Sequence, residues 1–328
     1  MSLPGEKIVV TGGLGFIGSH FVDMILSTRP GRELVVLDAN TYCGSRRNLE
    51  AHAGNSKLSI VEDSVCQSET VDRVLKGAGV VVHFAAETHV DRSISSARPF
   101  FETNVMGTLN VLESCRRHEV RKIVVVSTDE VYGNCSESAT ESDTLLRPAS
   151  PYAASKAAAD LTARSFFATY DVPVCIVRPV NNFGPRQYPE KLIPKFIERM
   201  IAGEKVPVYG HGGNTREWLY VKDTCRAILS LIEHFSANVV GEVFNIGSGV
   251  EKSVLEITGS ITGLLDIDGE NVIEWVDDRP AHVERHRVNW NKIRRVTGWE
   301  PIFDFEEGLK RTVSWYMEHR GGEYDNWW

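Results

Sequence analysis

Two motifs in the middle of the chain carry residue types that move protons, and the first is a tyrosine paired with a lysine. Tyr152 and Lys156 are four residues apart, so a helix would place the phenol and the ammonium group on one face. A nearby cation favours the phenolate form of a tyrosine. A phenolate can take a proton from an alcohol while a hydride leaves the same carbon. Because Tyr-x-x-x-Lys is common by chance, its meaning depends on the rest of the chain.

The second motif is Thr128-Asp129-Glu130, which ends an apolar run. In a doubly wound sheet, the C-terminal ends of the strands line the ligand crevice. Thr128 can hydrogen-bond the same substrate hydroxyl as Tyr152. Two adjacent carboxyl groups can act as an acid and a base, one protonated and the other charged, and the elimination of water needs such a pair. Taken alone, the triplet is more simply interpreted as an exposed acidic turn.

A glycine-rich segment near the N-terminus predicts a dinucleotide site. Residues 11–18, TGGLGFIG, follow an apolar run and open a helical pattern. Gly13, Gly15 and Gly18 fit G-x-G-x-x-G, and Gly12 with Gly15 and Gly18 fits a wider variant. Glycines allow a tight turn, close approach of a pyrophosphate and close packing of helix on strand. The N-terminus of the helix also attracts the phosphates.

Acidic residues after the next apolar runs indicate which dinucleotide binds. Asp38 lies 20 residues beyond Gly18, where a carboxylate accepts hydrogen bonds from the adenosine ribose and repels a 2′-phosphate. This favours NAD, although Arg46 and Arg47 are close in sequence and leave NADP open. Asp63 is either a partner for the adenine edge or an ordinary solvated loop residue.

The elements that position these motifs alternate between apolar runs and segments of helix length. The runs are 8–10, 33–38, 58–61, 80–85, 122–128 and 174–178, and the helical segments include 18–27, 103–117 and 152–170. The runs are continuously apolar, which is typical of strands covered on both faces. The alternation predicts an α/β fold with a doubly wound parallel sheet of the Rossmann type.

The pattern changes after about residue 179, where proline and glycine become frequent. Such residues indicate loops around a ligand, and a late helix is expected near 305–319. We therefore expect a smaller mixed α/β C-terminal substrate domain. The NAD-binding domain would comprise residues 1–178 and about 214–235, and the nucleotide-sugar-binding domain about 179–213 and 236–328.

Composition excludes several classes of protein. The chain has 328 residues, 42% of them hydrophobic, and a net charge of −8. It can bury a substantial core, and its acidic balance argues against nucleic acid or an anionic membrane as partners. Its six cysteines lack the close spacing of zinc or redox sites, so we expect no metal and reduced thiols in a cytoplasmic protein. Neither a membrane-span-length apolar run nor a signal-peptide pattern is visible.

Together these motifs resemble the extended short-chain dehydrogenase/reductase superfamily, and within it the nucleotide-sugar 4,6-dehydratases, especially those that act on dTDP-glucose. The similarity covers nearly the whole chain. It is carried by TGGLGFIGSH at 11–20, HFAAETHVDRSI at 83–94, STDEVYG at 127–133, SPYAASKAAAD at 150–160, NNFGPRQYPEKLIP at 181–194 and N-x-R-E-W at 214–218. The Thr-Asp-Glu triplet is the specific element, because the related epimerases, decarboxylases and reductases usually lack the Asp-Glu pair.

The resemblance implies a hydro-lyase of deoxysugar biosynthesis and its reaction cycle. Tyr152, supported by Thr128 and Lys156, would take the proton of the C4 hydroxyl while the C4 hydride passes to NAD. Glu130 would then remove the C5 proton, and Asp129 would protonate the departing C6 hydroxyl. Return of the hydride to C6 would give a 4-keto-6-deoxy sugar, with dTDP-glucose as the first-choice substrate.

The resemblance also implies binding residues and a homodimer formed through the helices at 103–117 and 152–170. The NAD-binding residues would be Gly12, Gly15, Phe16, Ile17, Gly18, Asp38, Asn40, Thr41, Gly44, Asp63, Ser64, Phe84, Ala85, Ala86, Thr103, Tyr152, Lys156 and Asn182. The nucleotide-sugar-binding residues would be Thr88, Thr128, Asn181, Asn182, Lys191, Leu192, Pro207, Tyr209, Arg216, Arg279 and His282.

Two alternatives stay open. A C4-epimerase or decarboxylase of the same superfamily would keep Tyr152 and Lys156 without needing the acid pair, and a non-catalytic NAD-binding regulator would need neither. The chain also departs from the family pattern. Thr88 replaces a common serine, Val254 replaces an asparagine, and His286 replaces the tyrosine that normally follows Arg285, while Ala281 and Val283 are further departures.

Overall fold

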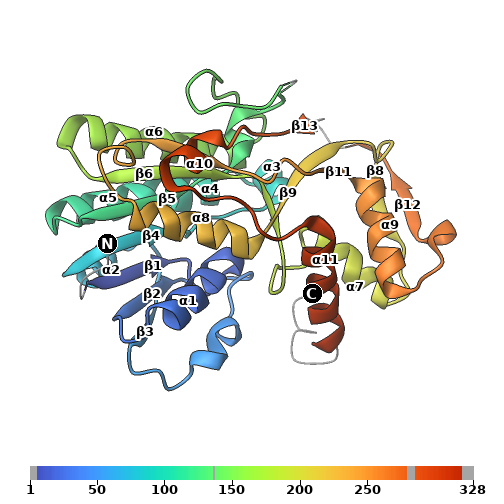
Figure 1. Ribbon diagram of the computed structural model, residues 1–328, viewed down its shortest axis with the longest axis horizontal. Coiled ribbons are helices and arrows are strands. Elements are labelled where there is room, and N and C mark those ends of the chain that lie inside the picture. Colours follow the sequence, from blue (N-terminus) through green and yellow to red (C-terminus); the bar gives the residue numbers. More distant parts are fainter. Residues whose placement is uncertain (1–5, 136, 279–284, 320–328) are drawn as a thin grey trace.

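The main element of the computed structural model is a seven-stranded parallel sheet (Figure 1). The structure describes residues 6–135, 137–278 and 285–319. In the order β10-β6-β5-β4-β1-β2-β3, the strands are β10 (Val243–Ile246), β6 (Val174–Pro179), β5 (Lys122–Val126), β4 (Ala78–His83), β1 (Lys7–Thr11), β2 (Leu34–Asp38) and β3 (Leu58–Glu62). The expected doubly wound α/β fold is confirmed.

Helices cover both faces of this sheet, which is why its strands are continuously apolar. On one face, α1 (Phe16–Thr28), α8 (Val221–Glu233) and α10 (Asn291–Thr297) pack over side chains such as Val10 and Val36. On the other face, α2 (Ser68–Leu75), α5 (Thr108–Arg117) and α6 (Pro151–Tyr170) pack over Val9 and Val81. Alternate residues of one strand therefore enter two different cores.

The strand order reverses beside β1, and this reversal locates the ligand crevice. The chain passes from β1 through β2 to β3, and then returns to place β4 on the other side of β1. Ligands of open α/β sheets bind at such a switch point, beyond the carboxyl ends of the strands. The segments after β1 and β4 meet there, since Phe84 N donates to Thr11 O at 3.0 Å.

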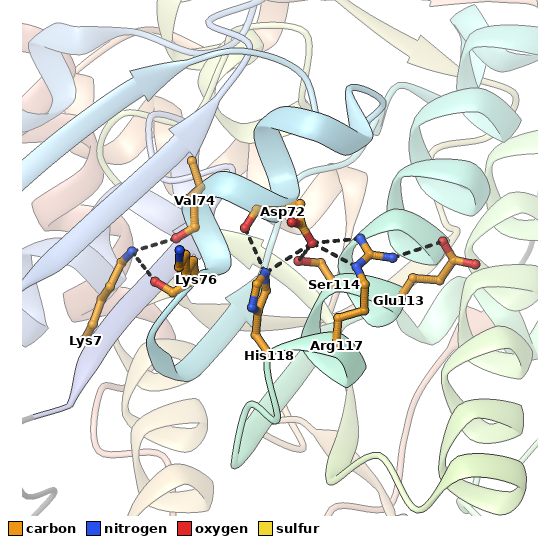
Figure 2. A network of polar contacts seen from close by, with 8 residues as sticks. All are labelled: Lys7, Asp72, Val74, Lys76, Glu113, Ser114, Arg117 and His118. Carbon is orange, nitrogen blue, oxygen red and sulfur yellow. Dashed lines mark hydrogen bonds and ion pairs between the residues drawn. The ribbon is translucent and has the colours of Figure 1, made fainter.

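Polar contacts fix α2 against the end of α5 on the outer side of the sheet (Figure 2). Oδ1 of Asp72 accepts a hydrogen bond from Arg117 Nε at 2.9 Å and lies 3.1 Å from His118 Nε2. Lys7 of β1 donates to the carbonyl of Val74 at 2.7 Å, near the C-terminal end of α2, where a cation is favoured. These contacts anchor α5 to the first strand.

The helix expected at 103–117 is longer and less regular than predicted. It begins with α4 (Arg98–Phe101), continues through a π-helical segment, η2 (Glu102–Gly107), and ends as α5. Short π-helical segments are frequent at functional sites. Here the segment places Asn104 between two parts of the chain: its side chain bonds both backbone groups of Glu87, at 2.8 and 3.0 Å, and Ser155 Oγ of α6 at 2.8 Å.

The remaining elements form a smaller mixed α/β unit. A four-stranded sheet contains β7 (Asn181–Phe183), β9 (Thr215–Tyr220), β11 (Glu251–Ser253) and β13 (Arg285–His286), and a two-stranded sheet pairs β8 (Val206–Tyr209) with β12 (Ile273–Val276). The helices α7 (Leu192–Ile201), α9 (Val254–Leu265) and α11 (Phe305–Glu318) pack with them around a third core. Among the described helices, none is long and apolar enough to cross a membrane.

Two strands depart from the expected domain limits. β10 belongs to residues 236–328 but pairs with β6 at the edge of the large sheet, in the register Phe244↔Val177. β9 belongs to residues 214–235 but pairs with β7 and β11 in the smaller sheet. Both corrections have one cause: strand pairing brings together segments far apart in sequence, which local composition does not reveal.

Candidate active site

A cavity of about 700 Å³ lies at the carboxyl ends of the parallel strands. Its lining includes the segments after β1, β2, β3 and β4, the end of β5 and the start of α6. From the smaller unit, α7, β8 and β9 also contribute. The cavity therefore contains both the expected dinucleotide loop and the expected catalytic motifs.

Every predicted NAD-binding residue lines this cavity except Asn40. Asn40 has a left-handed backbone conformation, and its N–H donates to Asp38 Oδ1 at 2.8 Å. Leu14 N donates to Asp38 Oδ2, also at 2.8 Å. Asn40 thus positions the acid instead of facing the cavity.

The glycine loop packs so closely on neighbouring backbone that side chains at two of its positions would clash. A Cβ on Gly18 would lie 2.1 Å from Gly12 O, and a Cβ on Gly12 would lie 2.5 Å from Ala85 N. Gly15 precedes α1 and offers no side-chain hydrogen bond to the first turn, so the N–H groups of that turn remain available to an anion. This cradle fits the pyrophosphate of a dinucleotide.

The acids beyond β2 and β3 fit the adenosine end of the same ligand. Burial raises the pKa of Asp38 against the hydrogen bonds that it accepts from backbone N–H groups. Asp63 accepts hydrogen bonds from Thr70 Oγ1 at 2.5 Å and Ser64 N at 2.8 Å, and the Thr70 bond contributes most to its lowered pKa. Arg46 pairs with Glu62, and neither Arg46 nor Arg47 lines the cavity. The lining therefore favours NAD over NADP.

Tyr152 and Lys156 lie on the first turns of α6, which begins at Pro151 with Ser150 as its N-cap. Both side chains are buried and line the cavity. Lys156 Nζ donates to Val126 O at 2.6 Å, and burial lowers the pKa of Lys156 to about 8. Burial and the nearby Glu130 raise the pKa of Tyr152. In the protein without its ligands, burial therefore makes the phenolate of Tyr152 less favourable, and the expectation that Lys156 favours this phenolate stays a prediction.

The acid pair occupies a short 3-10 turn after β5, η3 (Asp129–Tyr132). Thr128 caps this turn: its Oγ1 accepts from Glu130 N at 3.3 Å and donates to Asp129 Oδ1 at 3.3 Å. Glu130 lines the cavity, whereas Asp129 is 3% exposed and lies behind the lining. The interpretation as an exposed acidic turn is therefore wrong.

The environment of Asp129 opposes its negative charge. Burial, with contributions from Glu130 and Glu217, raises the pKa of Asp129 to about 8. Its Oδ2 is buried and accepts no hydrogen bond from the described part of the chain. Asp129 is consequently protonated at neutral pH and can act as an acid beside a second carboxyl group, the division of roles that the sequence predicted.

A buried polar network holds the turn that carries the two acids. Arg178 of β6 donates to Asp160 Oδ2 of α6 at 2.7 Å and to Tyr132 Oη at 2.8 Å. Tyr132 in turn donates to Asn245 Oδ1 of β10 at 2.8 Å. After Tyr132 the chain needs Gly133, which has φ +72° and a Cβ position 2.1 Å from Arg147 O. The network therefore connects the turn to α6, which carries Tyr152 and Lys156.

The described candidates for binding a nucleotide sugar also line the cavity. They are Thr88, Thr128, Asn181, Asn182, Lys191, Leu192, Pro207, Tyr209 and Arg216. Asn182 uses its amide internally, with Val180 O at 2.8 Å and Thr224 Oγ1 at 2.6 Å. Arg279 and His282, with the departures Ala281 and Val283, lie outside the described residues. Among the described residues, no group of three or more His, Cys, Asp or Glu side chains is placed to hold a metal ion.

Sequence reasoning missed several polar residues of the lining, including Glu87, His89, Glu190 and His286. Tyr42 donates to Glu190 Oε1 at 3.2 Å, and His89 Nε2 lies 3.6 Å from Glu190 Oε2. The segments 83–94 and 181–194 were identified as informative, but nothing in them distinguished these side chains from their neighbours. His286 was noted only as a departure from the family pattern.

The fold and the site define a dinucleotide-dependent enzyme of the short-chain dehydrogenase/reductase type. Comparison with known proteins makes this more specific: the chain belongs to the family described as GDP-mannose 4,6 dehydratase, whose profile matches residues 9–312. The low-salt glycan biosynthesis protein Agl12 of Haloferax volcanii is 46% identical over 310 residues, covering 94% of this chain and 98% of that protein.

Two dehydratases are similar over comparable lengths. The dTDP-glucose 4,6-dehydratase of Streptomyces niveus is 44% identical over 98% of this chain and 94% of its own length. The crystal structure of DesIV, a dTDP-glucose 4,6-dehydratase from Streptomyces venezuelae with NAD and TYD bound, superposes with a TM-score of 0.92. It is 44% identical, and the match covers 96% of this chain and 98% of that one.

Replacing Asp129 with asparagine should stabilise the protein increasingly as the pH rises. Between the ordinary pKa of 3.8 and the raised pKa of about 8, the folded protein keeps a proton that the unfolded chain has released. Wild-type stability therefore declines as the pH rises through this range, at about 1.4 kcal/mol per unit of pKa difference. We expect the Tm of D129N to exceed that of the wild type by at least about 3 °C near pH 8, and the gap to close near pH 4, in thermal melts across that range.

Asp72→Asn is the matched control, because the pKa of Asp72 is shifted in the opposite direction to that of Asp129. Its hydrogen bond to Arg117 lowers the pKa of Asp72, so the stabilisation is present above the ordinary pKa and is lost only in acid. D72N should be less stable than the wild type by a constant margin from about pH 5 to pH 8. A D129N advantage that does not grow with pH would contradict the protonated state assigned to Asp129.

Proposed function

We propose that this protein is a hydro-lyase of deoxysugar biosynthesis that uses NAD to convert a nucleoside-diphosphate hexose, with dTDP-glucose as first choice, into its 4-keto-6-deoxy derivative. One observation carries the proposal: a protonated Asp129 and an adjacent Glu130 stand beside the cavity that also contains Tyr152 and Lys156. The relatives named dTDP-glucose 4,6-dehydratase support the choice of nucleotide.

The first half of the reaction is oxidation at C4. Bound NAD supplies a hydride acceptor that later returns the hydride to C6. Tyr152 takes the proton of the C4 hydroxyl, and Thr128 hydrogen-bonds the same oxygen. Lys156 places a positive charge in the same buried region, which helps Tyr152 to lose its own proton before turnover.

The second half is loss of water across C5 and C6. The C4 ketone makes the C5 proton acidic, and Glu130 removes it. Asp129 donates its proton to the departing C6 hydroxyl, which leaves as water. Once the hydride reaches C6, Glu130 returns a proton to C5, so the reaction involves no net oxidation.

Residues on the far side of the cavity suit a nucleoside diphosphate. Arg216 carries a guanidinium group that matches the geometry of phosphate oxygens. Tyr209 offers an aromatic face to a pyrimidine base. Lys191 donates to Thr88 O at 2.7 Å, which holds the segment after β4 against the start of α7.

The acid pair also separates this function from its alternatives. An epimerase or a decarboxylase needs the tyrosine and the lysine but no buried acid to protonate a leaving hydroxyl. A non-catalytic regulator needs neither the tyrosine–lysine pair nor the acid pair. In such a protein, burial of Asp129 would cost free energy of desolvation without serving a reaction.

Incubation with dTDP-glucose, UDP-glucose and UDP-N-acetylglucosamine, without added reductant, tests the proposal. We expect dTDP-glucose to lose one water, detected by mass spectrometry. A product of unchanged mass would favour epimerisation, and no reaction with any of the three sugars would favour a decarboxylase or a regulator.

Glu130→Gln tests the assignment of the base in the same assay. The variant should stop exchange of the C5 proton with solvent and reduce turnover at least about 100-fold, while NADH still accumulates, because oxidation at C4 does not need Glu130. Glu113→Gln, on the outer side of α5, is the matched control and should leave turnover unchanged. Exchange at C5 that survives in E130Q would exclude Glu130 as the base.

We further propose that the protein is a homodimer formed through α5 and α6 and that it is cytoplasmic. Support for the dimer comes from large apolar side chains exposed on and beside these helices: Phe101 (42%), Met106 (51%) and Leu161 (56%). Contiguous exposed apolar residues mark interfaces. Support for a cytoplasmic location comes from the cysteines, all six of which are free thiols.

Leu161→Glu should convert this dimer into a monomer, because it places a charge in the middle of an apolar interface. Light scattering after size-exclusion chromatography should show the molar mass of the variant halved. Leu264→Glu changes another exposed leucine, on α9, and should leave the mass unchanged. A wild type that is monomeric at every concentration, or an L161E variant that keeps its dimeric mass, would contradict this interface.

A further inference from the structure

The imidazole of His286 lies beside the buried acid. His286 on β13 has Nδ1 3.8 Å from Asp129 Oδ2. The two residues are 5% and 3% exposed. His286 lines the cavity, whereas Asp129 does not. β13 is held in place by β9, with His286 opposite Arg216 in the register. His286 is therefore next to Asp129 and in contact with the cavity space.

A count of protons in the proposed reaction shows why this position matters. Tyr152 gains the proton of the C4 hydroxyl, and Glu130 takes a proton from C5 and later gives one back. Asp129 loses its proton to the departing hydroxyl. Each turnover thus leaves Tyr152 with one proton more and Asp129 with one fewer, so Asp129 must be reprotonated before the next turnover.

We propose that His286 is a positioning residue that acts through Asp129 and returns this proton to it. The N–H bond of the imidazolium breaks as the O–H bond of Asp129 forms. Tyr152 releases its excess proton to water in the cavity, and the imidazole regains one proton from that water, so no net proton is gained or lost. No electrons change hands in this step. The inference rests on the proposed role of Asp129 as the acid that protonates the leaving hydroxyl.

The two oxygens of Asp129 have different surroundings. Oδ1 accepts a hydrogen bond from Thr128, whose hydroxyl also accepts from Glu130 N and hydrogen-bonds Tyr152. Oδ2 is buried, accepts no hydrogen bond from the described residues and is the atom that His286 approaches. A proton arriving from His286 reaches the oxygen that is ready to accept it.

Burial, together with the acids on its own turn and on β9, makes a deprotonated Asp129 unfavourable. The titratable and charged groups that face Asp129 are Glu130 on its own turn, Cys135 in the following loop, Tyr152 on α6, Arg216 and Glu217 on β9, and His286 on β13. Of these, Glu130 and Glu217 raise the pKa of Asp129, and Arg216 lowers it. After donation the carboxylate faces two acids across a desolvated space, so rapid reprotonation benefits turnover.

Two substitutions of His286 test the inference. His286→Phe keeps a ring of similar size, and His286→Asn keeps a hydrogen-bonding atom near the position of Nδ1; neither can pass a proton. Because Asp129 begins each experiment protonated, the first turnover should proceed at nearly the wild-type rate. Later turnovers should be slower by at least about tenfold, so rapid-quench measurements should show a burst of one product per active site. Added imidazole should restore the later turnovers, most strongly below its own pKa.

His118→Phe is the matched control, because His118 also lies beside an aspartate, Asp72 (Figure 2), but neither residue lines the cavity. It should show neither the burst nor the response to imidazole. Thermal melts and NAD content of both His286 variants establish that they are folded.

Three results would contradict the inference in distinguishable ways. Unchanged steady-state turnover in both variants would show that Asp129 is reprotonated by another route. A first turnover slowed as much as the later ones, without rescue by imidazole, would assign His286 a packing role alone. A wild type that produces no dehydrated sugar would overturn the proposed function itself, and the inference with it.

Discussion

The desolvation of one carboxyl group is the constraint on which the site depends. A carboxylate taken out of water must be paired or must keep its proton. Asp129 is buried near other acids, and one of its oxygens accepts no hydrogen bond from the residues that the structure describes. It therefore keeps its proton at neutral pH. The same proton that makes burial tolerable is the one that an elimination reaction consumes, so stability and chemistry are coupled at this residue.

The surrounding structure can be understood as the means of holding that acid in place. The Arg178 network joins the turn after β5 to α6 and to β10. Glu217 of β9 accepts hydrogen bonds from the backbone N–H groups of Ser248, Gly249 and Val288. Segments from both units thus enclose the acid from opposite directions. The contacts of these segments hold Asp129 in a buried position that is itself unfavourable in free energy, a pattern common at functional sites.

Sequence reasoning found what local patterns determine. Continuous apolar runs identified six strands of the large sheet, because burial on both faces requires apolar residues at every position. The glycine loop and the tyrosine–lysine pair were found because their chemistry depends on spacing within one element. The structure brings nearly all of these residues to one cavity.

What sequence reasoning missed depends on contacts between distant segments. The four residues of β10 join a sheet whose preceding strand, β6, ends more than sixty residues earlier in the chain. Asp129 is buried behind the cavity lining, and His286 lies near it because β13 pairs with β9. The pKa of Tyr152 rises because its side chain is buried and Glu130 lies nearby. None of these effects leaves a signal in the spacing of residues.

The central claim is that oxidation, elimination and reduction occur on one sugar that stays in one cavity. The most direct measurement uses dTDP-glucose carrying deuterium at C4, with single turnover followed by mass spectrometry and NMR. If the account is right, the product has lost one water and carries the deuterium at C6 of the same molecule, even when unlabelled substrate is mixed in. Deuterium lost to solvent, found at C4 of an isomer, or transferred to another sugar molecule would contradict it.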